Sequence, residues 1–153
     1  MRLLEHRIPP IVVVAAIGTM MYALSPLLPS FDFGWAARGF FSLAIAGVGA
    51  WFVGAGVIEF LRNKTTVDPR QPDKASALVV SGIYKISRNP MYVGFALLLL
   101  ALTVYLQSPL LVVGVVLFVL YMNRFQIAPE ERAMITLFGD QYVRYQSRVR
   151  RWI

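Results

Sequence analysis

The chain has 153 residues, of which 58% are hydrophobic and 15% are charged. A soluble domain carries about 25% charged residues, and a chain of this length leaves roughly 30% of its unfolded-state surface exposed. The composition therefore excludes an ordinary soluble globular protein and predicts a membrane protein. The formal net charge is +7, which in a membrane protein reflects orientation in the bilayer, so we expect no nucleic-acid partner.

The residue types that are missing narrow the chemistry. The chain has no cysteine, so disulfides, thiolate nucleophiles, zinc knuckles and iron-sulfur clusters are excluded, and its one histidine, His6, disfavours an imidazole-ligated metal site. We expect no metal site, and we interpret His6 as a solvated residue beside the membrane. Any reaction must then use carboxylates, arginines, tyrosines and backbone groups, with the difficult electronics supplied by a cofactor.

Four apolar stretches follow one another along the chain, at residues 11–28, 40–61, 91–106 and 110–122. The first two are long enough to cross a bilayer as helices. The last two are separated by Gln107-Ser108-Pro109, a turn signal, and as one helix they would measure roughly 48 Å against a hydrocarbon core of about 30 Å. We therefore predict an all-α integral membrane protein, a single domain over residues 1–153, with transmembrane helices at about 10–29, 38–61, 88–106 and 109–126.

The distribution of charge predicts the orientation. Residues 62–90 hold six basic and two acidic side chains, and residues 123–153 hold six and three. Basic segments stay on the cytoplasmic side, so we expect a multi-pass cell-membrane protein with both termini and the 63–90 loop inside. A cleaved signal peptide is the alternative for the amino end, and Pro26 directly after Ser25 disfavours it.

Small residues recur in the second stretch. Gly49 and Gly56 lie one heptad apart, and Ala46, Ala50 and Gly54 follow a four-residue spacing. Such spacing allows neighbouring helices to approach closely in lipid. A phosphate-binding glycine loop is the alternative, but the segment lacks the third glycine of that motif and lies inside a predicted span.

Glu59 lies near the end of the same stretch, three residues before Arg62. A carboxylate at this depth is either a functional acid within the membrane or a side chain that reaches the interface. The sequence leaves both interpretations open.

Two clusters of polar and aromatic residues flank the last two spans. Tyr84, Arg88, Asn89 and Tyr92 gather where the third helix enters the membrane. By composition alone, such a cluster is typical of an interfacial belt of aromatic and basic residues.

The second cluster follows the fourth span. Pro129 suits the first position of a new helix, and the adjacent Glu130 and Glu131 suit its first turn. Gly139 can end that helix and Asp140 can cap another. We therefore predict amphipathic helices over residues 129–152 that lie on the anionic membrane surface, with Arg144, Arg148 and Arg151 on their basic face.

The segments LVVSGIYKISRNPMYVG (78–94) and PEERAMITLFGDQYVRYQSRVRRW (129–152) occur in this order, about thirty residues apart. Together they resemble the isoprenylcysteine carboxyl methyltransferase family and its phospholipid N-methyltransferase relatives, over roughly residues 64–152. Such proteins are small multi-helix membrane enzymes. They bind S-adenosylmethionine at the cytosolic face and methylate a lipid-borne acceptor.

The resemblance also implies roles for particular residues. Those matching the cofactor-binding positions are Ser76, Ala77, Leu78, Val79, Tyr84, Arg88, Asn89, Pro90, Met91, Tyr92, Glu130 and Glu131. Glu130 and Arg124 match catalytic positions, and Arg124 and Gln126 match the region that binds the acceptor. The family commonly has histidine where this chain has Asn89. It can also place an acceptor-binding arginine where this chain has Gln126, in which case Arg124 can substitute.

The chemical identity of the methyl acceptor is what the sequence determines least. A carboxylate is ionised at neutral pH and needs no general base, which suits two motif blocks without histidine. We therefore expect a lipophilic or lipidated acceptor, with a carboxylate of isoprenylcysteine type first, and contact with membrane lipids. The alternatives are an N-methyltransferase for phospholipids or small amines, a nicotinamide-dependent membrane reductase, and a non-catalytic membrane protein. The sequence specifies no oligomeric state.

Overall fold

The computed structural model describes residues 8–32, 34–63 and 78–153. Within these ranges the chain forms helices joined by turns, with no strand. The predicted all-helical fold class is confirmed. His6 lies outside the described residues, and so do Ser76 and Ala77 of the 63–90 loop, to which the resemblance assigns cofactor binding.

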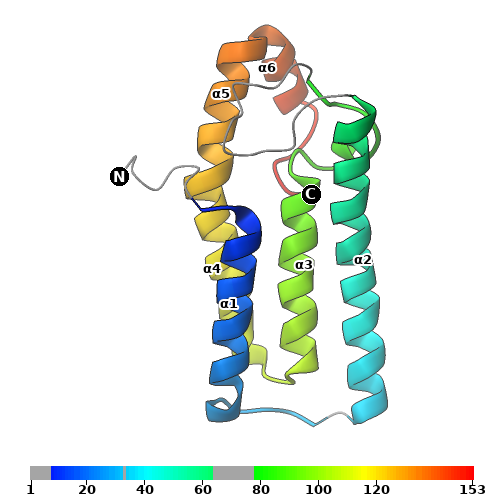
Figure 1. Ribbon diagram of the computed structural model, residues 1–153, viewed down its shortest axis with the longest axis vertical. Helices are drawn as coiled ribbons and strands as arrows, with labels where there is room; N and C mark the ends of the chain where they lie inside the picture. Colours follow the sequence, from blue (N-terminus) through cyan, green and yellow to red (C-terminus); the bar gives the residue numbers. More distant parts are fainter. Residues whose placement is uncertain (1–7, 33, 64–77) are drawn as a thin grey trace.

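The helices follow the predicted apolar stretches (Figure 1). In chain order they are α1 (Pro10–Leu24) with the short turn η2 (Ser25–Leu27), α2 (Trp35–Arg62), η4 (Gly82–Lys85), α3 (Pro90–Tyr105), η5 (Pro109–Leu111), α4 (Val112–Met122), the π-helical turn η6 (Asn123–Ile127), α5 (Ala128–Phe138) and α6 (Asp140–Gln146).

Three helical segments are long and apolar enough to cross a membrane, namely Pro10–Leu27, Trp35–Arg62 and Pro109–Phe138. The apolar helix α3 is shorter, with 16 residues, which corresponds to about 24 Å. The structure thus supports a membrane protein by the length and composition of its helices. The four-span topology stays a prediction.

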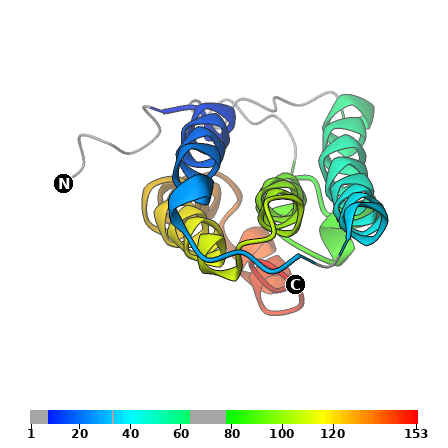
Figure 2. The same ribbon diagram turned by 90° about the horizontal axis from the view of Figure 1, so that it is seen from below.

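Helix α3 lies at the centre of the arrangement, between α2 on one side and the neighbouring helices α1 and α4 on the other (Figure 2). It contacts α2 most extensively and also packs against α1 and α4. Residues of α1, α3 and α4 form the main hydrophobic core, which includes Met21, Leu99 and Phe118. The N-terminus of α3 is therefore held in the middle of one end of the molecule.

The close approach of α2 and α3 depends on glycine. A Cβ atom at Gly49 would lie 2.9 Å from the carbonyl oxygen of Gly94, and one at Gly56 would lie 2.7 Å from Met91 Cγ. These distances confirm the predicted helix packing for Gly49 and Gly56. A Cβ atom at Gly54 would have nothing within 4 Å. Gly54, the last residue of the predicted series with four-residue spacing, therefore does not take part in the close contact between α2 and α3.

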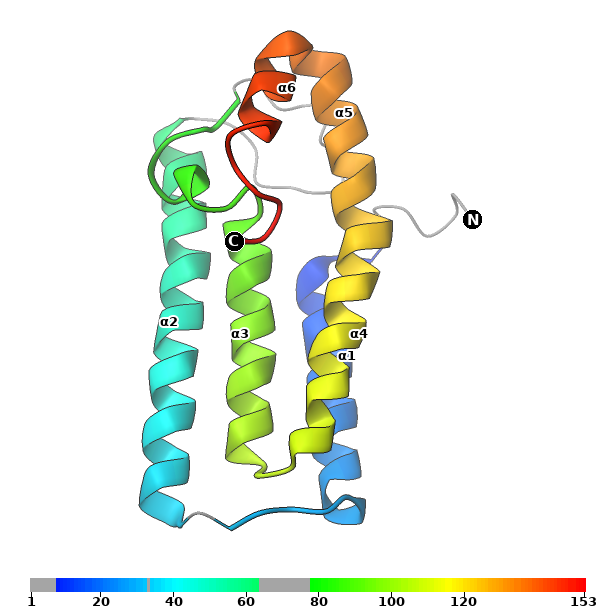
Figure 3. The ribbon, with the colours of Figure 1, turned by 180° about the vertical axis from the view of Figure 1, so that it is seen from behind.

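Helices α4 and α5 form one continuous helical run (Figure 3), where the sequence led us to expect a new helix at Pro129. Proline lacks an N–H, and its ring crowds the carbonyl four residues earlier. The wider π-helical turn that ends at Ile127, two residues before Pro129, accommodates the ring, so the helix shifts its register without ending. The run Pro109–Phe138 has 30 residues, about 45 Å, which is longer than a hydrocarbon core of about 30 Å.

The carboxyl end folds back towards the bundle. Gly139, with φ 50°, ends α5 and occupies the N-cap position of α6 without a side-chain cap, so Asp140 begins α6 where we expected it to cap. Helix α6 ends at Gln146, and the tail 147–153 returns to the N-terminus of α3 (Figures 1 and 3). The expected helical face carrying Arg148 and Arg151 is therefore absent, because both residues lie in this tail.

Candidate functional site

The two sequence clusters meet at one end of the bundle (Figure 1). The last turn of α2, the turn η4, the N-terminus of α3, the helix α5 and the tail 147–153 all contribute side chains there. These segments are far apart in the sequence. The central position of α3 is what brings them together.

Glu130 and Tyr92 form the direct link between the clusters. The hydroxyl of Tyr92 donates to Glu130 Oε1 at 2.6 Å, across 38 positions of sequence. Tyr92 is 6% exposed, so the carboxylate is held at the inner face of α5 against α3. Glu130 therefore does more than begin a helix.

Glu131 lies between two arginines. Arg88 Nη1 lies 3.0 Å from Glu131 Oε1, and the side chains of this pair are 11% and 13% exposed. Arg151 Nε and Nη2 donate to the two carboxylate oxygens at 3.1 and 2.5 Å, the two-pronged arrangement that guanidinium and carboxylate groups favour. This hydrogen bonding raises the pKa of Arg151 above its usual value.

The expected position of Arg151, on the basic face of a helix that lies on the membrane surface, is therefore wrong. A carboxylate as shielded as Glu131 requires paired cations. Arg151 points inward and supplies one of these cations, so the tail that contains it packs against the bundle.

Asn89 holds this tail as well. Its Nδ2 donates to the carbonyl oxygen of Arg151 at 2.9 Å, and the backbone N–H of Arg88 donates to the carbonyl oxygen of Arg150 at 3.0 Å. The hydroxyl of Ser87 accepts from the Asn89 backbone N–H at 3.1 Å. The amide at position 89 therefore connects the start of α3 to the carboxyl end of the chain.

Tyrosines form the apolar side of the site. Tyr84 is buried and meets Phe60 edge to face, with 5.4 Å between ring centroids. Its carbonyl oxygen accepts from the hydroxyl of Tyr145 at 2.6 Å. Burial raises the pKa of the Tyr84 and Tyr145 hydroxyls well above their usual range, and it raises the pKa of Tyr142 to about 12. These phenols are neutral hydrogen-bonding groups at physiological pH.

The remaining predicted cofactor residues pack beside them. Val79 is buried in one hydrophobic cluster with Tyr84, and Leu78 is partly buried. Pro90 begins α3 and is fully buried, while Met91 lies against Gly56 of α2.

Arg124 and Gln126, the predicted acceptor-binding pair, both lie in the π-helical turn. Arg124 is exposed, and its guanidinium lies 5.5 Å from the centroid of the Phe125 ring. Gln126 is fully buried, and its Nε2 donates to the carbonyl oxygen of Ile8 at 2.7 Å. Gln126 Oε1 is buried without a hydrogen-bond partner within the described ranges.

Sequence reasoning missed some residues that the structure places here. Trp152 donates from Nε1 to Asn123 Oδ1 at 3.0 Å and packs against both hydrophobic clusters. Arg151 and Tyr145 were assigned to a surface helix. In the structure they contact Glu131 and Tyr84, which lie 20 and 61 positions away in the sequence. No local sequence pattern could have revealed these contacts.

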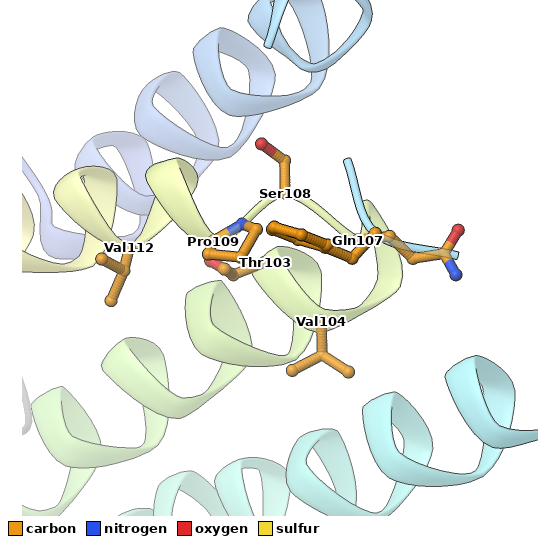
Figure 4. Close-up of a pocket in the computed structure, with 7 residues that line it drawn as sticks. Thr103, Val104, Gln107, Ser108, Pro109 and Val112 are labelled. Carbon is orange, nitrogen blue, oxygen red and sulfur yellow. The ribbon is translucent and has the colours of Figure 1, made fainter. Parts of the chain in front are cut away.

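The opposite end of the bundle holds an apolar cavity of about 380 Å³ (Figure 4). It is lined by Phe31, Thr103, Val104, Gln107, Ser108, Pro109 and Val112. Phe31 lies in the loop between α1 and α2, and the other lining residues lie in or beside the turn between α3 and α4, so the cavity is not part of the candidate site. Across the described part of the chain, no group of three His, Cys, Asp or Glu residues could hold a metal ion.

Comparison with known proteins identifies the family. The family model for phospholipid methyltransferases matches residues 37–141. The chain belongs to this family. The match covers α2 from residue 37 onward together with α3, α4 and α5, and it includes Tyr92, Glu130 and the arginine-paired Glu131. It ends before the tail that contains Arg151.

Two relatives that are named as methyltransferases agree with this assignment and with the resemblance seen in the sequence. The chain is 39% identical over 67 residues to methanethiol S-methyltransferase 1 of Bradyrhizobium diazoefficiens, covering 44% of this chain and 22% of the relative. It is 36% identical over 87 residues to the protein-S-isoprenylcysteine O-methyltransferase of Xenopus laevis, covering 57% and 30%. It is also 48% identical over 63 residues to an uncharacterized protein of Haemophilus influenzae, covering 41% of this chain and all of the relative. The chain thus spans less than a third of each of the two methyltransferases.

Proposed function

We propose that the protein is an S-adenosylmethionine-dependent methyltransferase that acts on a lipophilic, membrane-borne acceptor. The observation that carries the proposal is the Tyr92–Glu130 hydrogen bond, which joins the two motif blocks at one end of an apolar helix bundle. The family assignment supports the reaction class. Relatives named for S-methylation and for O-methylation support a methyltransferase without fixing the acceptor atom.

The residues at the site fit this cofactor by their chemistry. S-adenosylmethionine carries an ammonium, a carboxylate, ribose hydroxyls and an adenine. Glu130 can accept from the ammonium or the ribose, and Arg88 Nε, buried without a hydrogen-bond partner within the described residues, can donate to the carboxylate. Tyr84 and Trp152 supply aromatic surface for the adenine.

When bound, the cofactor supplies a methyl group that its sulfonium has already activated. The residues of this chain then bind, orient and exclude water. Glu130 would orient the cofactor while Tyr92 fixes the carboxylate, and the tail that Arg151 and Asn89 hold would shield the site from solvent. The assignments of Ser76 and Ala77 to cofactor binding stay predictions from the resemblance.

The first candidate acceptor is a carboxylate of isoprenylcysteine type. With a reference pKa near 4, a carboxylate is already ionised at neutral pH, whereas a lipid amine with a pKa near 10 must lose a proton. For a carboxylate we expect turnover to be nearly flat between about pH 6 and 8.5 and the product to be an ester that alkali hydrolyses. A rate rising tenfold per pH unit, with an alkali-stable product, would contradict this acceptor.

Gln126 favours a second candidate, an amine or another acceptor that donates a hydrogen bond. Gln126 offers a carboxylate no positive charge, and one of the two N–H donors of its Nε2 is engaged by the carbonyl oxygen of Ile8. Its buried Oε1 is an acceptor atom without a partner in the described part of the chain. A carboxylate substrate would depend on Arg124 instead. The Arg124→Gln variant separates the two, because we expect it to raise the KM of a carboxylate acceptor and leave that of an amine unchanged.

The topology belongs to the same proposal. We place four spans in the cell membrane, namely the three long helical segments and the shorter helix α3. Both termini then lie in the cytoplasm. The candidate site then faces the cytoplasm, and the acceptor enters sideways from the lipid.

Calorimetric titration of the detergent-purified protein tests the proposal. We expect S-adenosylmethionine and S-adenosylhomocysteine to bind, and reduced nicotinamide nucleotides not to bind. Binding of the nicotinamide nucleotides alone would favour a membrane reductase. Binding of none of the three would favour a non-catalytic membrane protein.

A further inference from the structure

Glu59 has a partner that neither sequence interpretation anticipated. The hydroxyl of Ser81 donates to Glu59 Oε2 at 2.5 Å, across 22 positions of sequence. Arg62 Nη1 lies 3.4 Å from Glu59 Oε1, but the Arg62 side chain is 73% exposed while that of Glu59 is 12% exposed. Since an exposed ion pair contributes little, Ser81 is the stronger partner.

Gly82 closes the other side of this contact. Its φ is 54°, and a Cβ atom there would overlap the Glu59 carboxylate. A side chain at position 82 would therefore face both backbone strain and a steric clash. The turn after Ser81 is shaped to lie directly on the carboxylate.

This contact determines where the next residues lie. Tyr84 follows in η4 and packs against Phe60, the neighbour of Glu59 on α2. From the opposite side, Tyr145 of α6 donates to the carbonyl oxygen of Tyr84. The last turn of α2 thus supports the 78–84 segment from one side, and α6 holds it from the other.

We propose that Glu59 is a positioning residue, which holds the 78–84 segment in its cofactor-binding arrangement through its hydrogen bond with Ser81. The inference rests on the proposed function, because that function assigns Tyr84 to the cofactor, and the family resemblance implies the same role for Leu78 and Val79. Glu59 itself need not touch the cofactor. Its carboxylate acts through Ser81 and the turn that follows.

Three single variants in full-length protein test the role. Ser81→Ala removes the donor, Ser81→Thr keeps a hydroxyl, and Arg62→Gln is the matched control that removes only the exposed ion pair. Each is titrated with S-adenosylmethionine, and amide hydrogen exchange is followed in peptides covering 82–88 and 92–105. The first peptide contains the turn amides of Tyr84 and Ile86, which donate to the carbonyl oxygens of Ser81 and Ile83.

We expect Ser81→Ala to weaken S-adenosylmethionine binding roughly tenfold, because the lost hydrogen bond is to a charged group. Exchange should accelerate in the 82–88 peptide and stay unchanged in the 92–105 peptide. Ser81→Thr should restore both properties, and Arg62→Gln should leave both unchanged.

Unchanged exchange in Ser81→Ala would contradict the positioning role whatever the cofactor does. Faster exchange with unchanged affinity would show that the segment does not serve the cofactor, and would also overturn the inference. Equal losses in Ser81→Thr and Ser81→Ala would attribute the effect to shape and not to the hydrogen bond. A wild-type protein that fails to bind S-adenosylmethionine would contradict the proposed function, while the exchange comparison still decides whether Glu59 holds the turn.

Discussion

The two ends of the helix bundle both carry clusters of polar residues, but these clusters differ in how far they are exposed to solvent. At the site end, Glu131 and Arg88 form an ion pair with side chains only 13% and 11% exposed. At the opposite end, Asp32 is exposed, accepting from the Gly34 backbone N–H at 2.8 Å and from Gln107 Nε2 at 3.2 Å. Shielding charges from water is costly, whereas fastening a surface loop with exposed hydrogen bonds is not.

The shielded charges are therefore the ones that call for a functional explanation. The exposed cluster fastens the loop between α1 and α2 to the turn between α3 and α4, and the backbone N–H of Phe31 completes it by donating to the carbonyl oxygen of Gln107 at 2.9 Å. Arg38 joins it from α2, with its guanidinium 4.9 Å from the centroid of the Tyr105 ring. These contacts account for that end without any ligand.

The largest expected difference between the ends is their accessibility. The natural lack of cysteine allows Asp32→Cys and Arg148→Cys to be probed singly in intact cells with an impermeant thiol reagent. We expect labelling at position 32 and none at position 148, because the basic site end faces the cytoplasm. The reverse pattern would invert the topology, and labelling at both positions would reject the odd number of spans, three, that the proposal places between them.

The next largest effect concerns Glu130. Glu130→Gln should weaken S-adenosylmethionine binding at least roughly tenfold, because a charge-assisted hydrogen bond contributes about 1.5 to 3 kcal/mol. The matched control is Asp140→Asn, which neutralises an exposed carboxylate at the start of α6. Calorimetry gives the affinity, and circular dichroism should show unchanged helix content in both variants. Equal affinities would return Glu130 to the role of a helix-end charge.

A smaller effect should separate two adjacent arginines in the tail. Arg151→Gln removes the two-pronged contact with Glu131, whereas Arg150 contributes its carbonyl oxygen to Arg88 and has an exposed side chain. We expect Arg151→Gln to lower the thermal midpoint in detergent by a few degrees, and Arg150→Gln to leave it unchanged. Identical midpoints would mean that the side chain of Arg151 does not hold the tail.

The smallest effect should come from Asp32. Hydrogen bonds from the Gly34 backbone and then from Gln107 lower the pKa of its carboxyl below the ordinary value of 3.8. A lowered pKa stabilises the fold above that ordinary value, and the contribution is lost as the pH falls through the folded-state pKa. Asp32→Asn should therefore lower the thermal midpoint slightly at pH 7, with the difference disappearing as the pH falls through the folded-state pKa of Asp32. Cofactor affinity should be unchanged, and a loss of affinity would mean that the two ends are coupled.

The fold was predictable where one local pattern decides it. The apolar stretches gave the helices, and Gln107-Ser108-Pro109 gave the turn between α3 and α4. Pro129 shows where local rules stop. The sequence indicates that proline interrupts the helical register, but not that a π-helical turn upstream absorbs the interruption and lets α5 continue α4.

The candidate site was predictable only through resemblance. Nothing in the spacing of Tyr92 and Glu130 indicates that they meet, because their contact depends on α3 lying at the centre of the bundle. The position of Arg151 in the sequence matches the periodicity of an amphipathic helix. In the structure it instead forms an ion pair with the shielded carboxylate of Glu131, which no local pattern indicates. The role of Glu59 likewise required its partner Ser81 to be seen in space.

Methyl transfer into membrane lipids or lipidated proteins tests the central claim most directly. Purified protein is incubated with methyl-labelled S-adenosylmethionine and an extract of membrane lipids and lipidated proteins, and the label in the organic and protein fractions is counted before and after mild alkali. We expect labelled product with the wild type and far less with Glu130→Gln, with alkali releasing the label if the acceptor is a carboxylate. Label that appears equally with both proteins, or with neither, would contradict a methyltransferase site built on Tyr92 and Glu130.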